Sequence, residues 1–95
     1  MLFRSKLSNN TLAGIIPSSI GNLIQLAFLD LYDNQLSGPF TFGLTNLTQL
    51  VVLNLSGNRL SGPIPFGLMN LTKLYVLGLW ENEFEGEFTI SIKTK

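Results

Sequence analysis

Hydrophobic residues recur along this chain at one fixed spacing of 24 residues. A fixed period of this kind indicates a repeat architecture, in which each copy is one structural unit. We therefore predict four copies, at about residues 2–25, 26–49, 50–73 and 74–95. Five apolar columns hold their type over the four copies: Leu2, Leu26, Leu50, Leu74; Leu7, Leu31, Leu55, Leu79; Leu12, Leu36, Leu60, Phe84; Ile16, Phe40, Ile64, Phe88; and Ile20, Leu44, Leu68, Ile92.

Within one copy, the pattern predicts a short strand, an extended segment and a tight helical turn. Leu53 and Leu55 alternate with Asn54 and Ser56, which is the period-2 pattern of a strand with one buried face. The glycine at position 62 and the prolines at 63 and 65 favour a second extended or irregular segment. Apolar residues at 68, 71 and 74 have the three-residue spacing of a 3-10 turn. We expect the first strands of the four copies to stack in parallel.

An asparagine follows each predicted strand, at the point where the chain must turn. A buried amide there can donate to, and accept from, backbone groups of adjacent turns that no strand ladder satisfies. We therefore predict a structural column formed by Asn10, Asn34, Asn58 and Asn82.

The sequence of the third copy carries a family resemblance. The run L-x-x-L-x-L-x-x-N-x-L-S-G-x-I-P-x-x-[IL]-x-N-L-x-x-L is nearly complete from Leu50 to Leu74 and resembles the plant-specific class of leucine-rich repeat. This resemblance extends over essentially the whole chain. It implies an α/β-type repeat solenoid, a right-handed coil with short parallel strands on the concave face and irregular or 3-10 turns on the convex face. Such repeats occur in the ectodomains of plant receptor-like kinases and receptor-like proteins and in secreted glycosidase inhibitors.

Departures from the repeat are concentrated near the two ends of the chain. Ser5 occupies the column of Leu29 and Leu53, so the first strand has one core leucine fewer, and the last copy ends in the polar residues 93–95. No Cys-bearing cap precedes the first copy. We expect a single leucine-rich repeat domain over residues 1–95 without recognisable caps, and interpret it as a fragment or a truncated product.

Composition excludes most catalytic chemistry. The 95 residues contain no Cys and no His, so zinc-finger, thiolate, Ser/His and haem-ligand sites are excluded. Six basic and six acidic residues give no positive field for nucleic acid or anionic lipid. We expect no enzyme activity, no catalytic residues, no cofactor, no metal and no nucleic-acid partner.

No hydrophobic segment of the sequence indicates targeting or membrane insertion. The first ten residues lack the apolar core of a signal peptide, and apolar runs such as Leu50–Leu53 fall far short of the ~18 residues that span a bilayer. We expect no direct membrane insertion by this chain, and an extracellular or cell-surface location if it is part of a longer receptor.

The candidate binding surface is the set of side chains that point out of the predicted concave sheet. Adjacent members of a column would lie ~4.8 Å apart, one strand spacing. Aromatic residues beside carboxylates resemble a peptide or sugar binding surface, because rigid aromatic area supplies binding energy. The alternative is that these residues only fill a variable surface. The predicted ligand-binding residues are Phe28, Asp30, Tyr32, Asp33, Asn54, Ser56, Val76, Trp80 and Glu81.

Two further patterns have weaker functional implications. Glu81, Glu83, Glu85 and Glu87 alternate along one extended segment, so they do not converge as calcium requires, and a solvated polar face is the preferred interpretation. The same geometry offers no opposing carboxylate for glycoside hydrolysis.

Four Asn-x-Ser/Thr acceptors for N-glycosylation begin at Asn9, Asn46, Asn54 and Asn70. Asn46 and Asn70 should lie on the convex turn and Asn54 on the concave sheet.

The leading hypothesis is a non-catalytic protein- or peptide-binding module from the ectodomain of a plant receptor-like kinase or receptor-like protein. Its partner would be a peptide or another leucine-rich repeat protein. One alternative is an inhibitor of a secreted hydrolase such as a polygalacturonase. Another is a truncated product without independent function, capable only of end-to-end self-association or of stacking on longer relatives.

Overall fold

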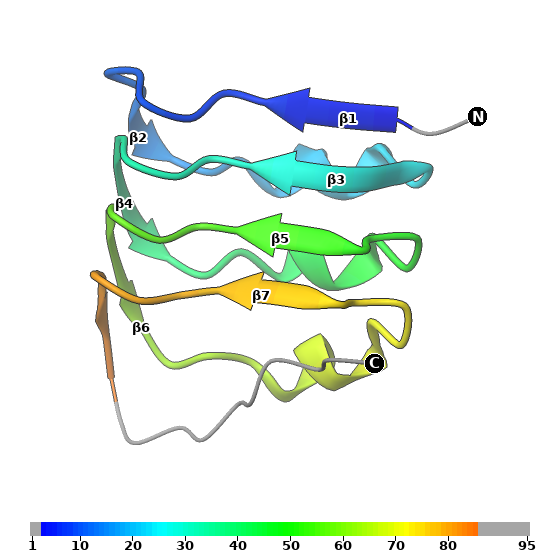
Figure 1. The fold of residues 1–95 in the computed structure, drawn as a ribbon. Helices are drawn as coiled ribbons and strands as arrows, with labels where there is room; N and C mark the ends of the chain where they lie inside the picture. The colour runs from blue at the N-terminus through cyan, green and yellow to red at the C-terminus, as the bar shows by residue number, and fades with distance from the viewer. Residues whose placement is uncertain (1–2, 86–95) are drawn as a thin grey trace.

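The computed structural model describes residues 3–85 and consists of two parallel four-stranded sheets joined by 3-10 helices (Figure 1). Within residues 3–85, each copy contributes one strand to the first sheet and one strand to the second, and η1, η2 and η3 are 3-10 helices of the first three copies. The elements are β1 Phe3–Lys6, β2 Ala13–Ile15, η1 Ser18–Asn22, β3 Leu26–Asp30, β4 Gln35–Pro39, η2 Phe42–Asn46, β5 Val52–Asn54, β6 Arg59–Gly62, η3 Phe66–Asn70, β7 Val76–Gly78 and β8 Glu83–Phe84.

The first sheet, which we call the concave sheet, has the order β1-β3-β5-β7, and every pair is parallel. Its register follows the 24-residue period, since Phe28 pairs with Val52 and Val52 with Val76. The period therefore predicts both the strands and their alignment, and both predictions are confirmed.

The second sheet has the order β2-β4-β6-β8 and is also parallel. It lies along one edge of the concave sheet in Figure 1, where the chain turns back. The sequence pattern indicated only an extended or irregular segment here, because Gly and Pro interrupt any alternation. The regularity comes from stacking: Gly38 pairs with Leu60, and Pro39 with Ser61, across adjacent copies.

The 3-10 helices lie behind the concave sheet and begin after residues with extended backbone (Figure 1). Pro17 and Pro65 precede η1 and η3 with φ of −71° and −73°. Thr41 precedes η2 with φ −79° and accepts a hydrogen bond from the Gly43 N–H through its side chain. Threonine thus replaces proline at this position without changing the path of the chain.

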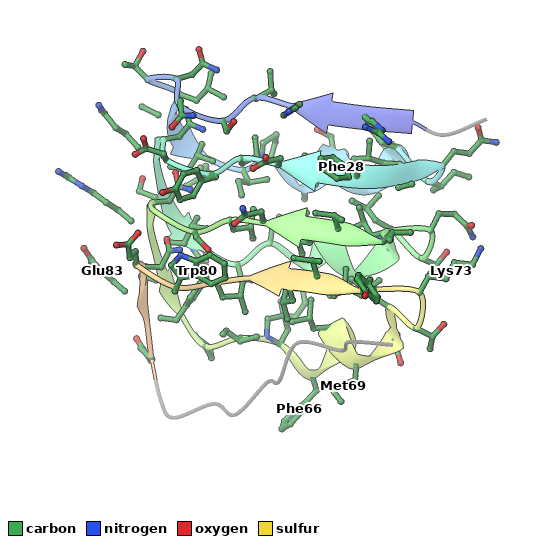
Figure 2. All side chains as sticks on the ribbon, in the orientation of Figure 1. Phe28, Phe66, Met69, Lys73, Trp80 and Glu83 are labelled. Atoms are coloured by element: carbon green, nitrogen blue, oxygen red, sulfur yellow. The ribbon has the colours of Figure 1, made fainter. Side chains whose placement is uncertain are left out.

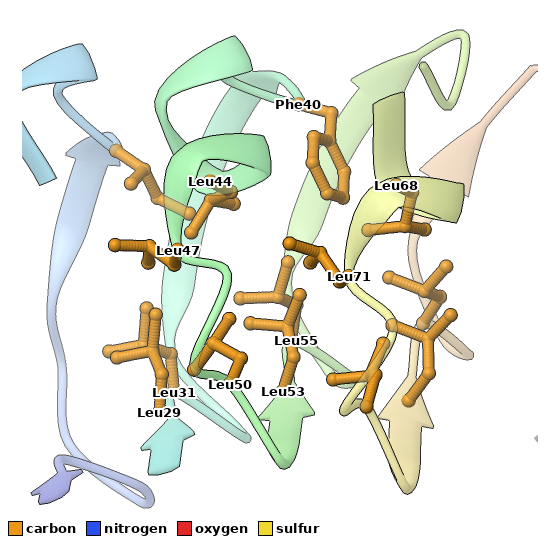
Figure 3. Packing of buried hydrophobic residues seen from close by; sticks show 14 of the residues in the cluster. Leu29, Leu31, Phe40, Leu44, Leu47, Leu50, Leu53, Leu55, Leu68 and Leu71 are labelled. Carbon is orange, nitrogen blue, oxygen red and sulfur yellow. The ribbon is translucent and has the colours of Figure 1, made fainter. Parts of the chain in front are cut away.

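The core is a column of leucines enclosed by the two sheets and the 3-10 helices (Figure 3). In each central copy, side chains from both sheets and from the 3-10 helix point into this core. Leucines such as Leu53 and Leu55 are completely buried. Leu7 and Leu12 of the first copy are exposed, in contrast to the buried leucines of the same two columns, Leu31 and Leu36, in the second copy. Ser5 pairs with Leu29 in the sheet, which confirms that the first strand has one core leucine fewer.

The asparagine column connects consecutive copies through hydrogen bonds to the backbone. Asn58 donates from Nδ2 to the carbonyl oxygens of Leu31 and Leu55, at 3.0 Å each, and accepts the Leu36 N–H at 3.0 Å. Asn34 and Asn82 make the equivalent bonds one copy earlier and one copy later. We call this chain of bonds the asparagine ladder. Asn34, Asn58 and Asn82 bond as the predicted structural column requires, whereas Asn10 is exposed and donates to carbonyl oxygens of its own copy.

Candidate functional site

The concave sheet presents an apolar strip along its middle. Phe28, Val52 and Val76 are partly exposed and stand in one register on β3, β5 and β7. On β1, the guanidinium of Arg4 lies 5.2 Å from the centre of the Phe28 ring, which is cation–π distance. The strip therefore carries a cation over an aromatic face at one end and aliphatic side chains at the other.

Two residues further along each strand lies the column that contains Asp30 and Asn54. Its polar side chains form hydrogen bonds to the backbone. Asp30 and Asn54 each accept, through Oδ1, the backbone N–H two residues later, at 3.1 Å. These bonds fix the chain as it leaves β3 and β5 and orient the residues that follow. Both were predicted to bind ligand; the structure shows them half-buried, with one carboxyl or amide oxygen already bonded.

Tyr32 and Trp80 follow the ends of β3 and β7, two copies apart in one column. Trp80 is 52% exposed and Tyr32 is exposed as well. Figure 2 shows Trp80 at the end of β7, toward the edge where the second sheet begins. The prediction that both aromatic side chains are exposed is confirmed.

Ser56 stands between these two aromatic residues in the column, but it is 0% exposed, so its predicted exposure on the concave sheet is wrong. Its hydroxyl oxygen lies beside Gly78, where a Cβ would be only 2.9 Å away. Since Gly78 has no side chain, the short Ser56 side chain packs against the next strand. The Ser56 hydroxyl is buried without a hydrogen-bond partner among residues 3–85.

The residues directly after the column of Tyr32 and Trp80 have a left-handed backbone conformation. Asn9, Asp33, Gly57 and Glu81 have φ of 58°, 61°, 72° and 59°. The carboxylates of Asp33 and Glu81 are therefore held in the turns directly after Tyr32 and Trp80, and both residues are exposed. Sequence reasoning missed this conformation, although Asn9, Asp33 and Gly57 are all residue types that adopt it readily.

The predicted binding residues thus form two groups. Phe28 and Val76 lie within the strands, whereas Tyr32, Asp33, Trp80 and Glu81 lie just beyond the strand ends. We call the second group the aromatic–acidic edge. It combines exposed aromatic area with negative charge beside the concave sheet, an arrangement that can bind a peptide.

The glycosylation acceptors are divided between the two faces as expected. Asn46 and Asn70 are the last residues of η2 and η3 and are exposed, whereas Asn54 ends β5 and is half-buried. Asn9 is exposed in the turn after β1.

Metal ligands and membrane spans are not seen in the described part of the chain. Between residues 3 and 85, no three His, Cys, Asp or Glu residues gather closely enough to hold a metal ion. Glu87, which belongs to the predicted acidic segment, lies outside these residues. None of the described helices has the length and hydrophobicity required to cross a bilayer.

Comparison with known proteins places these repeats among plant receptor ectodomains. The family model described as Leucine Rich Repeat matches residues 6–23, 25–47 and 49–71. A comparison with curated proteins finds no match.

Three solved structures illustrate the similarity. The PEPR1–AtPEP1 complex is 36% identical with a TM-score of 0.87, over 90% of this chain and 12% of that one. The Arabidopsis receptor kinase HAESA, in complex with the peptide hormone IDA and the co-receptor SERK1, is 40% identical with a TM-score of 0.82, over 86% and 14%. The BIR2 ectodomain from Arabidopsis thaliana is 36% identical with a TM-score of 0.83, over 85% and 43%.

This chain spans less than half the length of each of these solved chains. The family model nevertheless matches three consecutive copies, and the sheets, 3-10 turns and asparagine ladder repeat with the same period. The chain belongs to the leucine-rich repeat family, and its repeats are of the plant receptor-kinase ectodomain type.

Proposed function

We propose that this chain is a non-catalytic binding module of the extracellular part of a plant receptor-like kinase or receptor-like protein. Its concave sheet binds a peptide or another leucine-rich repeat protein. The observation that carries the proposal is the contrast between the two sides of each strand. The inward leucines repeat from copy to copy, whereas the outward columns change type and present Phe28, Tyr32 and Trp80.

The similar structures support this assignment. PEPR1 is seen with AtPEP1, and HAESA with a peptide hormone and a co-receptor. The similarity extends over 12% and 14% of those two receptors, which supports a segment of such an ectodomain rather than a whole one.

The chemistry of the aromatic–acidic edge favours a ligand with a positive charge. Asp33 and Glu81 place exposed carboxylates next to Tyr32 and Trp80, so a lysine or arginine side chain can pair with a carboxylate while its stem lies on a ring. Arg4 over Phe28 already shows one such packing on the same sheet. Energetically important contacts should come from the aromatic residues, which dominate binding hot spots.

The test is selection of peptides from a random displayed library on the complete 95-residue chain. Selected peptides should be enriched in Lys or Arg. Their affinity for the Phe28→Ala, Tyr32→Ala, Trp80→Ala triple variant should fall at least tenfold, because hot-spot residues are worth ~2 kcal/mol or more each. Trp80 is the single tryptophan, so its fluorescence reports contact at this edge directly.

A matched control replaces Lys73, an exposed residue of the loop before β7, by alanine, and binding should be unchanged. Peptides that bind the triple variant as tightly as the original chain would overturn the proposed site. Enriched peptides without basic residues, but sensitive to the triple change, would retain the site and refute the charge preference.

A further inference from the structure

The fourth copy lacks a hydrogen bond that the second and third copies share. Tyr32 and Ser56 each donate their backbone N–H to the side-chain Oδ1 of the residue two positions earlier, at 3.1 Å. The corresponding donor in the fourth copy is the Trp80 N–H, but the residue two positions earlier is Gly78, which has no side chain. Within residues 3–85, the Trp80 N–H has no acceptor.

The backbone of the fourth copy otherwise follows the same path as that of the other copies. The Trp80 carbonyl oxygen accepts the Gly57 N–H at 3.1 Å, just as the Ser56 carbonyl oxygen accepts the Asp33 N–H at 3.0 Å. Glu81 has a φ of 59°, close to the 61° of Asp33. The Trp80 N–H should therefore point to the concave side of the sheet, where the missing side-chain oxygen would lie.

A second unused donor lies at the same place. The Ser56 Oγ is 2.9 Å from the position that a Cβ of Gly78 would take, and Ser56 is 0% exposed. Its hydroxyl has no partner among residues 3–85. Lys6 fills this column in the first copy, so the two donors meet beside a glycine in the fourth copy. A buried polar group without a partner costs free energy, so the site needs an acceptor.

We propose that the Trp80 N–H and the Ser56 hydroxyl bind one main-chain carbonyl oxygen of the peptide ligand beside Gly78. This oxygen takes the role that a side-chain oxygen has in the second and third copies. A glycine within a strand often marks a place where another backbone approaches closely. A neutral carbonyl fits better than a carboxylate, because the exposed Glu81 would repel a negative charge. The inference rests on peptide binding in the proposed function and adds the contact that holds the ligand main chain.

Access to this site requires a neighbouring side chain to move. Asn54 Oδ1 lies 2.5 Å from the same Cβ position and is held by the Ser56 N–H. Trp80 is less restrained, since it is 52% exposed at the end of β7 (Figure 2). Its indole lies outside the leucine core, so it can turn aside without unfolding a copy. Binding should therefore change the fluorescence of Trp80.

The test combines nuclear magnetic resonance with substitution of Ser56. A peptide selected on the complete chain is added to the isotope-labelled chain. The Trp80 amide proton should shift downfield and exchange more slowly with solvent, whereas the Tyr32 amide, which already has an acceptor, should change less. Ser56→Ala should lower peptide affinity about 3- to 10-fold, the effect of one neutral hydrogen bond. It should not lower the Tm, because the hydroxyl makes no bond within residues 3–85.

Replacing single amide bonds of the peptide by esters identifies the carbonyl group, because an ester oxygen is a weaker acceptor. One ester position should lower the affinity for the original chain. The loss should be smaller for the Ser56→Ala variant, since two changes to one shared bond are not additive. The matched control is Ser61→Ala, which removes a hydroxyl from β6 in the same copy and should leave the affinity unchanged.

The outcomes separate this inference from the proposed function. A peptide that is sensitive to the Phe28, Tyr32 and Trp80 triple change, but indifferent to Ser56→Ala, would overturn the inference and keep the proposed function. A Trp80 amide that does not shift would overturn it as well. A lower Tm of Ser56→Ala with unchanged affinity would assign the hydroxyl to folding and have the same consequence. A chain that selects no peptide would overturn both proposals.

Discussion

Replacing Asn58 by alanine removes the central link of the asparagine ladder. Asn58 is almost fully buried, and its amide contacts the backbone of both its own copy and the preceding one. The carbonyl oxygens of Leu31 and Leu55 would each keep a second donor, since Asn34 and Asn82 also bond to them. The Leu36 N–H, in contrast, loses the acceptor that Asn58 supplies.

The expected loss follows from these unequal consequences. A buried N–H without a partner costs about 1–3 kcal/mol, and each hydrogen bond lost from a carbonyl that retains another donor costs ~1 kcal/mol or less. We expect Asn58→Ala to lower the free energy of unfolding by about 3 kcal/mol. For a domain of this size that corresponds to a fall of roughly 12–24 °C in Tm.

The measurement is urea unfolding followed by circular dichroism, with the slope m compared between variants to confirm that the same surface is exposed. The matched control is Asn10→Ala in the first copy, where the amide is exposed and donates to the carbonyl oxygens of Leu7 and Ser8, both in its own copy. That variant should lose less than ~1 kcal/mol. Equal losses for the two variants would refute the argument that bonds between copies make the ladder stabilising.

Three further substitutions test local geometry by thermal unfolding. Gly78→Ala would place a Cβ 2.5 Å from the Asn54 oxygen that accepts the Ser56 N–H. It should therefore lower the free energy of unfolding by about 1–2 kcal/mol, and adding Asn54→Ala should recover part of this loss because the clashing oxygen is removed. Glu81→Asn should stabilise by ~0.5 kcal/mol, because asparagine tolerates the left-handed φ of 59° better than glutamate. Thr41→Pro should stabilise the chain by ~0.5 kcal/mol, since φ is already −79°. Destabilisation would show that the lost hydrogen bond to the Thr41 side chain outweighs the gain from the restricted φ of proline.

Much of the fold could be predicted because one number, the repeat period, determines which residues become neighbours. Leu53 must lie beside Leu29 and Leu77 once the copies stack, and the structure pairs them. The asparagine column was equally predictable, because an amide repeated at a turn has a physical use only if it satisfies adjacent backbone. The resemblance to plant-type repeats agreed with this reasoning and is confirmed by the family match.

The candidate site was less predictable, because exposure depends on the size of side chains in the next copy. Ser56 has the alternation of an outward residue, yet Gly78 leaves a space into which it packs. Asp30 and Asn54 look like free ligand-binding groups in the sequence, but local hydrogen bonds occupy them in part. The second sheet was missed for a similar reason: its strands are regular only because equivalent segments stack, a property that no single copy displays.

The asparagine ladder also limits how such a chain can change its length. Each ladder oxygen accepts an N–H from 22 residues earlier, and each amide donates to a carbonyl 27 residues earlier. Inserting or removing one residue within a strand or at the turn that carries the asparagine shifts both partners out of register, whereas adding a complete 24-residue unit recreates every bond. Length changes that preserve the fold must therefore leave the bonded strand and turn positions in place, and the interval between successive asparagines is the complete unit by which this solenoid can be lengthened or shortened.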